Sequence, residues 1–283
     1  MIYLDNAAST RMDPEVLEAM KPFFIEKYGV ASSQFSHSPG LEARDGLDHA
    51  REIIASRLHC TPEELVFTSG GTEANNLALK GAAWARGKGH IICSKIEHNT
   101  VLHACEWLET QGYGLTILEV DDEGFVSPER LKDAMRDDTI LVSIQHGNQE
   151  VGTIQPVEDI AGLCKERKVL FHMDASLSFT QLEIDLESLP ADLVTTSAHK
   201  IHGPIGVGAL FVRQNTKLEK LFHGGYSEFD RRPGTENVAG AVGFGKAVEL
   251  ADPRHANAVG SLRGELVSQL RKTIPGLLLN GPQ

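Results

Sequence analysis

A lysine and an aspartate in the second half of the sequence occupy positions where their side chains could bind or react with a ligand. Lys200 is predicted to end a buried strand, ahead of a Gly-Pro turn, and Asp174 to end another. A lysine in such a place can have a lowered pKa and act as an amine nucleophile. A buried carboxylate is costly unless it is paired, and a protonated pyridine nitrogen is a suitable partner. The alternatives are a lysine that extends to solvent and an aspartate that caps the next segment.

Two further segments could complete a ligand site. Gly71 and Thr72 follow an apolar segment and open a predicted helix, whose free backbone N–H groups can bind a phosphate. The alternative is an ordinary glycine turn with a threonine cap. His98 follows another apolar segment and could stack on an aromatic ring and move protons, or could serve only as a helix cap or core residue.

A sheet must position these residues, because short apolar segments alternate with segments of helical spacing. The predicted strands are 64–69, 90–94, 115–120, 139–145, 169–175, 193–197 and 208–212. The predicted helices are 72–84, 99–111, 157–167 and one that begins at Pro128 with Ser127 as its N-cap. This alternation is typical of an α/β fold with a mostly parallel sheet between helices. Ligands bind at the carboxyl ends of such strands, where Ser197 and His199 also lie.

Composition narrows the class of protein. The 283 residues are 41% hydrophobic and carry a net charge of −12, with a sequence pI near 5.5. The length suits one large domain, alone or with a small one. The acidic balance argues against a nucleic-acid or membrane-surface partner. The N-terminus lacks the features of a signal peptide, and no apolar segment is long enough to span a membrane, so we expect a soluble cytoplasmic enzyme.

The four cysteines are expected to be reduced thiols that pack in the interior. Cys60, Cys93, Cys105 and Cys164 form no CxxC pair, which argues against a disulfide framework or a zinc site. Cys105 could share a helix face with His98, but its apolar helical spacing favours a core position.

Seven motifs together identify a resemblance to a known family. They are YLDNAAST, FTSGGTEANNLALKG, EHNTV, NQEVGTIQPV, DASLS, SAHKIHGPIGVGAL and RRPGTENVAG. From Tyr3 to about Gly281 the sequence resembles the class V aminotransferases, specifically the NifS/IscS-type cysteine desulfurases. The resemblance implies pyridoxal-phosphate fold type I, with a seven-stranded, mostly parallel sheet in the large domain. It divides the chain into 1–14 (N-terminal segment of the small domain), 15–250 (large cofactor-binding domain) and 251–283 (start of the C-terminal small domain).

The resemblance also implies roles for matching residues. Lys200 would hold pyridoxal 5′-phosphate as a Schiff base and act in catalysis with His98, which would stack on the ring and assist proton transfer. Asp174 would bind the pyridine nitrogen. Thr235 would reach the phosphate of a partner subunit's cofactor, which implies a homodimer. The residues expected to hold the phosphate are Gly71, Thr72, Ser197 and His199.

Three departures from the family pattern stand out. Gln149 replaces an Asn that contacts cofactor or substrate, and we expect it to contact the cofactor here. Leu177 replaces a Gln that hydrogen-bonds the ring hydroxyl, and leucine has no donor. The family continues past Gln283 with a loop that carries the catalytic Cys, which none of the four cysteines matches. We therefore expect the sequence to be a piece of a longer chain.

The implied activity is conversion of L-cysteine to L-alanine, with sulfur passed as a persulfide to an acceptor such as an IscU-like iron–sulfur scaffold. Two alternatives stay open. Leu177, Tyr226 and Ser227 depart from the family pattern and motivate a selenocysteine lyase or another pyridoxal-phosphate-dependent C–S lyase. The unmatched Cys loop motivates a cofactor-binding paralogue or scaffold with reduced catalysis.

Overall fold

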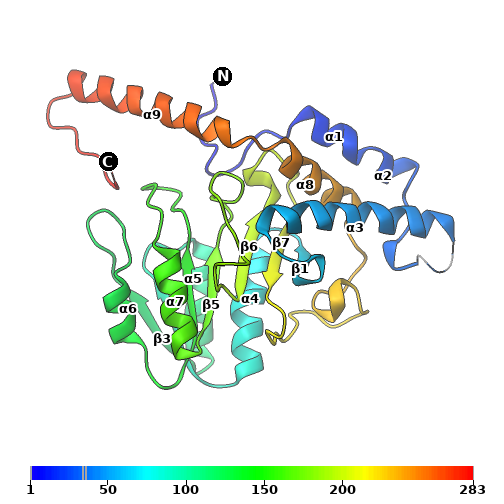
Figure 1. The fold of residues 1–283 in the computed structure, drawn as a ribbon, viewed down its shortest axis with the longest axis horizontal. Coiled ribbons are helices and arrows are strands. Elements are labelled where there is room, and N and C mark those ends of the chain that lie inside the picture. Colours follow the sequence, from blue (N-terminus) through cyan, green and yellow to red (C-terminus); the bar gives the residue numbers. More distant parts are fainter. Residues whose placement is uncertain (1, 34, 36, 283) are drawn as a thin grey trace.

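The computed structural model describes residues 2–33, 35 and 37–282, and its centre is a seven-stranded sheet (Figure 1). The strands are β1 (Leu65–Thr68), β2 (His90–Ser94), β3 (Gly114–Leu118), β4 (Thr139–Gln145), β5 (Leu170–Asp174), β6 (Leu193–Ser197) and β7 (Gly208–Val212). Their order is β1-β7-β6-β5-β4-β2-β3. Only β7 runs antiparallel to its neighbours, β1 and β6. The predicted mostly parallel sheet is therefore confirmed, and β2, β4, β6 and β7 have the predicted bounds.

Helices cover both faces of the sheet. They are α1 (Pro14–Met20), α2 (Pro22–Ile25), α3 (Ser38–Leu58), α4 (Gly71–Arg86), α5 (Asn99–Thr110), α6 (Pro128–Ala134), α7 (Val157–Arg167), α8 (Val238–Leu250) and α9 (Pro253–Thr273). The predicted cap of α6 is confirmed, because Ser127 accepts a hydrogen bond from the Arg130 N–H. α4 and α5 cover one face, while α3, α6, α7 and α8 cover the other (Figure 1).

The alternation of side chains in the strands explains the two layers of core. In β7, Leu210 and Val212 pack with α4 and α5, whereas Ala209 and Phe211 pack on the opposite face. Both sets are almost fully buried. Successive residues of a strand point to opposite faces, so a strand that is apolar throughout must be covered on both sides.

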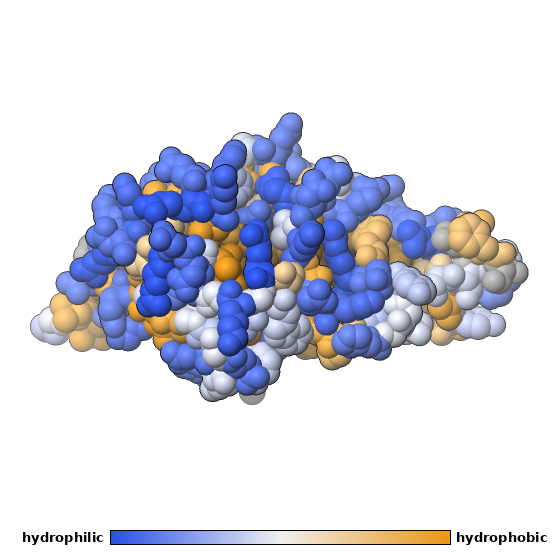
Figure 2. Space-filling view, turned by 90° about the horizontal axis from the view of Figure 1, so that it is seen from below, coloured by the Kyte–Doolittle hydropathy of each residue, from blue (hydrophilic) through white to orange (hydrophobic). Residues whose placement is uncertain are grey.

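The carboxyl ends of the parallel strands meet at the upper edge of the sheet in Figure 1, where the N-terminal segment crosses them. Thr10 holds this segment in place: its N–H and hydroxyl both donate to the His199 carbonyl at 2.9 Å. The hydroxyl also accepts from the His202 N–H at 2.7 Å. Figure 2 views the opposite edge, whose surface is predominantly hydrophilic. Because ligands of such sheets bind at the carboxyl ends of the strands, a site is expected at the upper edge.

Helix α9 extends along the top of the molecule with most of its side chains exposed (Figure 1). Val259, Leu262 and Leu266 are each at least 60% exposed. The division into a large domain and small-domain segments at 14/15 and 250/251 stays a prediction. Among the described residues, no helix has the length and apolar character needed to cross a membrane.

Candidate functional site

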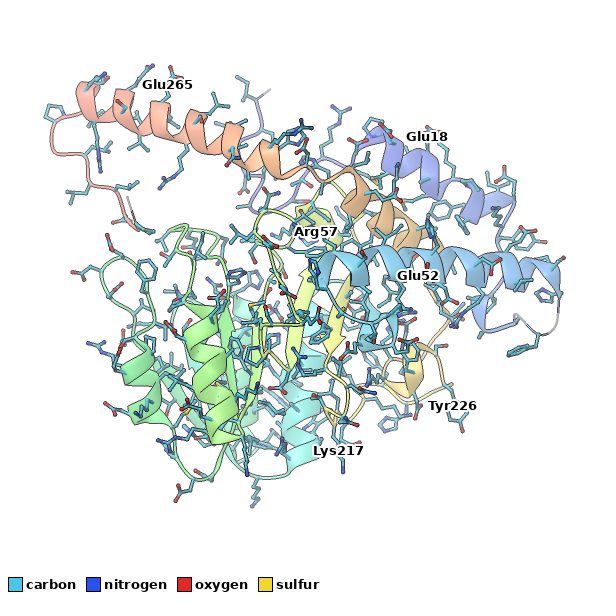
Figure 3. The ribbon with its side chains drawn as sticks, in the orientation of Figure 1. Glu18, Glu52, Arg57, Lys217, Tyr226 and Glu265 are labelled. Carbon is cyan, nitrogen blue, oxygen red and sulfur yellow. The ribbon has the colours of Figure 1, made fainter. Side chains whose placement is uncertain are left out.

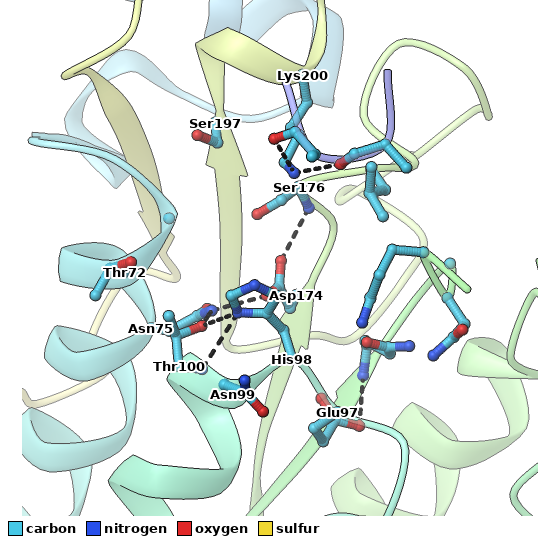
Figure 4. Close-up of a pocket in the computed structure, with 18 of the residues that line it drawn as sticks. Thr72, Asn75, Glu97, His98, Asn99, Thr100, Asp174, Ser176, Ser197 and Lys200 are labelled. Carbon is cyan, nitrogen blue, oxygen red and sulfur yellow. Dashed lines mark hydrogen bonds between the residues drawn. The ribbon is translucent and has the colours of Figure 1, made fainter. Parts of the chain in front are cut away.

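A cavity of about 880 Å³ opens at the carboxyl edge of the sheet (Figure 4). Of the nine residues predicted to form the site, eight line it: Gly71, Thr72, His98, Gln149, Asp174, Ser197, His199 and Lys200. The ninth, Thr235, lies exposed in the segment before α8 and does not line this cavity. The structure thus brings together residues that are up to 129 positions apart in the sequence, from Gly71 to Lys200.

Asp174 ends β5, as predicted, and its carboxylate is held by neutral donors. Asn75 Nδ2 donates to Oδ2 at 2.7 Å and the Ser176 N–H donates to Oδ1 at 2.9 Å. Asp174 is 8% exposed and forms no ion pair among the described residues. A nearly buried carboxylate that faces a cavity and forms no ion pair suits a positively charged ligand group. A protonated pyridine nitrogen meets that requirement.

Lys200 lies farther from its strand than predicted. β6 ends at Ser197, and Lys200 is the last residue of the 3₁₀ turn Ala198–Lys200. The prediction that it ends a strand was wrong by three residues, because the chain turns immediately after Ser197. Its amine donates to the carbonyls of Ala7 and Ala8 rather than extending to solvent. Burial lowers the Lys200 pKa, against the opposing effects of Asp174 and Asp5, which favours the neutral amine that a nucleophile needs.

His98 combines the two roles that the sequence offered as alternatives. It is the N-cap of α5, where its Nδ1 accepts from the Thr100 N–H at 3.2 Å, and it also lines the cavity. Thr100 Oγ1 lies 2.8 Å from the same nitrogen. Because Nδ1 is an acceptor, the neutral ring carries its proton on Nε2.

Asn75 and Thr100 connect His98 to Asp174, and the sequence did not point to either of them. Asn75 Nδ2 donates both to Asp174 and to Thr100 Oγ1, the latter at 2.8 Å, and Thr100 Oγ1 in turn contacts the His98 ring (Figure 4). The only signal was the position of Asn75 within the motif at the start of α4. This chain of hydrogen bonds fixes the imidazole relative to the carboxylate.

The N-terminus of α4 forms an anion-binding cradle beside Ser197. Gly70, its N-cap, has φ of 141° and ψ of −177°, a conformation open essentially to glycine alone. Within the described part of the chain, no acceptor contacts the backbone N–H groups of Gly71 and Thr72. A Cβ at Gly71 would lie 3.8 Å from Ser197 Cβ, and Ser197 Oγ is 2.8 Å from His199 Nδ1. These donors converge as a phosphate requires.

Glu97 is a buried acid in the cavity wall. Its Oε1 accepts from Ser94 Oγ at 2.5 Å and from the Gln145 N–H at 3.0 Å, while Oε2 is enclosed without a partner. Burial raises the Glu97 pKa to about 8, and the nearby charge of Asp174 adds to the rise. The side chain is therefore largely neutral near pH 7.

The thermal stability of the protein is expected to depend on pH through Glu97. The folded-state pKa of about 8 exceeds the unfolded value of 4.5, so the folded protein binds the proton more tightly. The contribution of Glu97 to stability is full at low pH and is lost as the pH rises from about 4.5 to about 8. Glu97→Gln should therefore raise the melting temperature relative to wild type most at the upper end of this range. Parallel pH profiles for wild type and Glu97→Gln, with exposed Glu106→Gln as the control, would contradict this.

The cysteines and two of the departures from the family pattern, Tyr226 and Ser227, lie outside the cavity. Cys93, Cys105 and Cys164 are buried in the core and Cys60 is half-buried, as predicted. Leu177 lines the cavity, but Tyr226 does not. Tyr226 is 86% exposed and projects into solvent (Figure 3). Of the changes that motivated a different lyase, Leu177 is the one placed to act on a ligand in this cavity.

Comparison with known proteins gives one family. The aminotransferase class-V model matches residues 2–280. Cysteine desulfurase IscS of Dictyoglomus turgidum is 47% identical, in an alignment covering 100% of this chain and 72% of that protein. Cysteine desulfurase IscS of Methanosarcina thermophila is 46% identical, with 99% of this chain and 70% of that protein covered.

Solved structures agree with the sequence relatives. A NifS-like protein superposes with a TM-score of 0.91 at 41% identity, covering 96% of this chain and 76% of its own. SspA in complex with cysteine superposes with a TM-score of 0.86 at 42% identity, covering 89% and 73% of the two chains. The fold expected from the motifs, pyridoxal-phosphate fold type I, is thereby confirmed.

Proposed function

The chain belongs to the class-V aminotransferase family, and we propose that it is a pyridoxal-phosphate-dependent cysteine desulfurase that converts L-cysteine to L-alanine. One observation carries the proposal: Lys200 and the buried carboxylate of Asp174, which forms no ion pair among the described residues, line the same cavity. The relatives named above, which are cysteine desulfurases at 46–47% identity, supply the substrate. The cysteine in the SspA complex is consistent with that choice.

The residues of the cavity fit pyridoxal phosphate group by group. Asp174 binds the ring nitrogen, and the N-terminus of α4 with Ser197 and His199 binds the phosphate. Lys200 supplies the amine that attaches the cofactor, and Gln149 contributes a further polar contact. When bound, the cofactor supplies an electron-poor ring that stabilises negative charge at the substrate Cα.

Lys200 and His98 are the residues that we propose for proton transfer. The lowered pKa of Lys200 favours a neutral amine, which would accept a proton from the substrate Cα. His98 would stack on the ring with Nε2 free for proton transfer, since its Nδ1 accepts from the Thr100 N–H. Asp174 would keep the ring nitrogen charged, because a buried carboxylate is stabilised by a cation beside it.

Reconstitution with pyridoxal phosphate and an assay for alanine test the proposal. We expect the purified full-length protein to be coloured and, with a thiol present to accept the sulfur, to release alanine from L-cysteine. A colourless protein that cannot be reconstituted would contradict the cofactor assignment. A coloured protein that releases no alanine from either L-cysteine or selenocysteine would instead favour a paralogue without sulfur transfer.

A second candidate activity, selenocysteine lyase or another C–S lyase, is favoured by Leu177, which lines the cavity in place of a polar residue. Comparing kcat/KM for alanine release from selenocysteine and from cysteine separates the two. A strong preference for selenocysteine would replace the desulfurase assignment.

We also propose the partners and location that the family likeness implies. Thr235 is exposed and so accessible to a second subunit, which is consistent with the proposed homodimer. The acceptor of the persulfide is proposed to be an iron–sulfur scaffold, and the location to be the cytoplasm. Sedimentation velocity of the cofactor-loaded protein tests the dimer, and a monomer would contradict the role of Thr235.

A further inference from the structure

Gln145 presents a buried amide without hydrogen bonds in the cavity wall. It is the last residue of β4, is 2% exposed and lines the cavity. Among the described residues, neither Oε1 nor Nε2 of its side chain has a hydrogen-bond partner, and Nε2 is completely enclosed. Buried polar groups are almost always paired, so an unpaired amide at a cavity indicates a ligand that completes it.

The register of the sheet places this amide beside the ring-nitrogen carboxylate. Gln145 and Asp174 are Cα partners in the parallel β4–β5 pair. Paired residues of neighbouring strands point to the same face and lie about 4.8 Å apart. A ring bound to Asp174 through its nitrogen therefore has the Gln145 side chain next to one of its edges.

The position of the anion-binding cradle at the N-terminus of α4 determines which edge of the ring faces Gln145. The cradle lies at the end of β6, on one side of β5, and Gln145 lies on β4, on the other side. Figure 4 shows the same arrangement: Ser197 and Thr72 lie on one side of Asp174, and Glu97, which binds the Gln145 backbone, lies on the other. In pyridoxal phosphate the phosphate-bearing and hydroxyl-bearing edges are on opposite sides of the axis from ring nitrogen to aldehyde carbon. The hydroxyl edge therefore faces β4.

We propose that the side-chain amide of Gln145, turned so that Nε2 takes the less enclosed position of Oε1, donates a hydrogen bond to the phenolic oxygen of pyridoxal phosphate. The inference rests on the proposed function, which assigns the ring nitrogen, the phosphate and the aldehyde to Asp174, the α4 cradle and Lys200. The phenolic oxygen is the one polar group of the cofactor then left without a partner. Leu177 lines the cavity but has no donor to offer.

Two neighbours of Gln145 bear on this assignment. Gln149 also lines the cavity, but it is only half-buried, so solvent can satisfy its amide. Glu97 contacts the Gln145 backbone, and burial keeps its carboxyl largely neutral. No full negative charge at that position repels a phenolic oxygen, which carries negative charge itself.

Gln145→Met tests the proposal, because methionine keeps the length of the side chain and removes the amide. We expect pyridoxal phosphate to bind about 5- to 10-fold more weakly, as measured by titrating apoprotein. Without the donor, the phenolic oxygen holds the proton shared with the Lys200 nitrogen more strongly. The pH midpoint of the visible absorption of the loaded protein should therefore rise, by about one unit.

The apoprotein distinguishes cofactor binding from a structural role. A residue needed only for folding would lower the melting temperature of the apoprotein when replaced. Gln145→Met removes an unpaired buried amide, so we expect that temperature to be unchanged or higher. Adding Leu177→Gln to Gln145→Met should restore part of the affinity and return the pH midpoint toward wild type, since position 177 lines the same cavity.

The outcomes separate this inference from the proposed function. A loaded protein whose affinity and pH midpoint are unaffected by Gln145→Met overturns the inference and leaves the cofactor assignment intact. The same two shifts in Gln149→Met, with none in Gln145→Met, would assign the donor to Gln149 instead. Failure of the wild-type protein to bind pyridoxal phosphate at all would overturn the proposed function.

Discussion

Lys200→Ala is expected to abolish the visible absorption of the cofactor-loaded protein and to reduce alanine release from L-cysteine to background. Lys200 lines the cavity together with Asp174, and its lowered pKa suits attachment to an aldehyde. Reduction of the loaded wild type with borohydride, followed by peptide mass spectrometry, should place the cofactor mass on the peptide that contains Lys200. An adduct on another lysine would contradict the assignment.

Lys95→Ala is the matched control for that experiment. Lys95 lines the same cavity, but its amine lies 2.8 Å from the Glu119 carboxylate, in an exposed ion pair. The control variant should keep both colour and turnover. Loss of Lys200 also removes the contacts to Ala7 and Ala8, yet the bonds between Thr10 and the His199 carbonyl remain. Circular dichroism is therefore expected to show a folded Lys200→Ala protein.

The strands were predictable from the sequence because their burial is uniform. β2 and β4 are apolar over nearly their whole length and have polar or turn-forming residues at both ends, so their bounds were predicted correctly. The position of Lys200 was predicted less well. The end of β6 at Ser197 was predicted correctly, but the pattern SAHK does not show that the chain turns there, and this turn is held by contacts with the N-terminal segment.

The relations between strands could not be predicted in the same way. Gln145 was placed correctly at the end of a strand, but its role depends on β4 lying next to β5, a property of the sheet order. The same holds for Asn75 and Thr100, which come from two helices and meet over Asp174. Sequence patterns report which face of an element is buried, and they carry little information about which distant residue lies opposite.

A buried ion pair closes the open side of the edge strand β1. Arg51, on α3, and Glu228 form two parallel bonds, with Nη2–Oε1 at 2.7 Å and Nη1–Oε2 at 2.8 Å. Arg51 also donates to the Leu65 carbonyl, and Glu228 accepts from the Phe67 N–H at 2.7 Å. β1 pairs with β7 on its other side, so these two side chains satisfy backbone groups that would otherwise be left unpaired at the edge.

The same pair holds a strained turn in the segment that leads to Thr235. Glu228, Phe229 and Asp230 have φ values of 50°, 57° and 61°, three consecutive residues in the left-handed region. Such a conformation persists only where surrounding contacts enforce it. The Arg51 guanidinium lies 5.1 Å from the centre of the Phe229 ring and 4.7 Å from that of Phe67. It is thus enclosed between two aromatic rings and a carboxylate.

Arg51→Met should lower the free energy of unfolding by about 3–5 kcal/mol, since it leaves the Glu228 carboxylate buried without its cation. Adding Glu228→Leu should recover part of the loss, because the unpaired charge is gone. Recovery should be incomplete, because the Phe67 N–H then has no acceptor. Denaturant unfolding of the two single variants and the double variant measures the coupling.

The control is Arg44→Met on the same helix, which breaks the solvent-accessible pair with Asp48 and should cost less than about 1 kcal/mol. Equal losses in Arg51→Met and Arg44→Met would show that burial of the Arg51–Glu228 pair does not govern the stability of this edge.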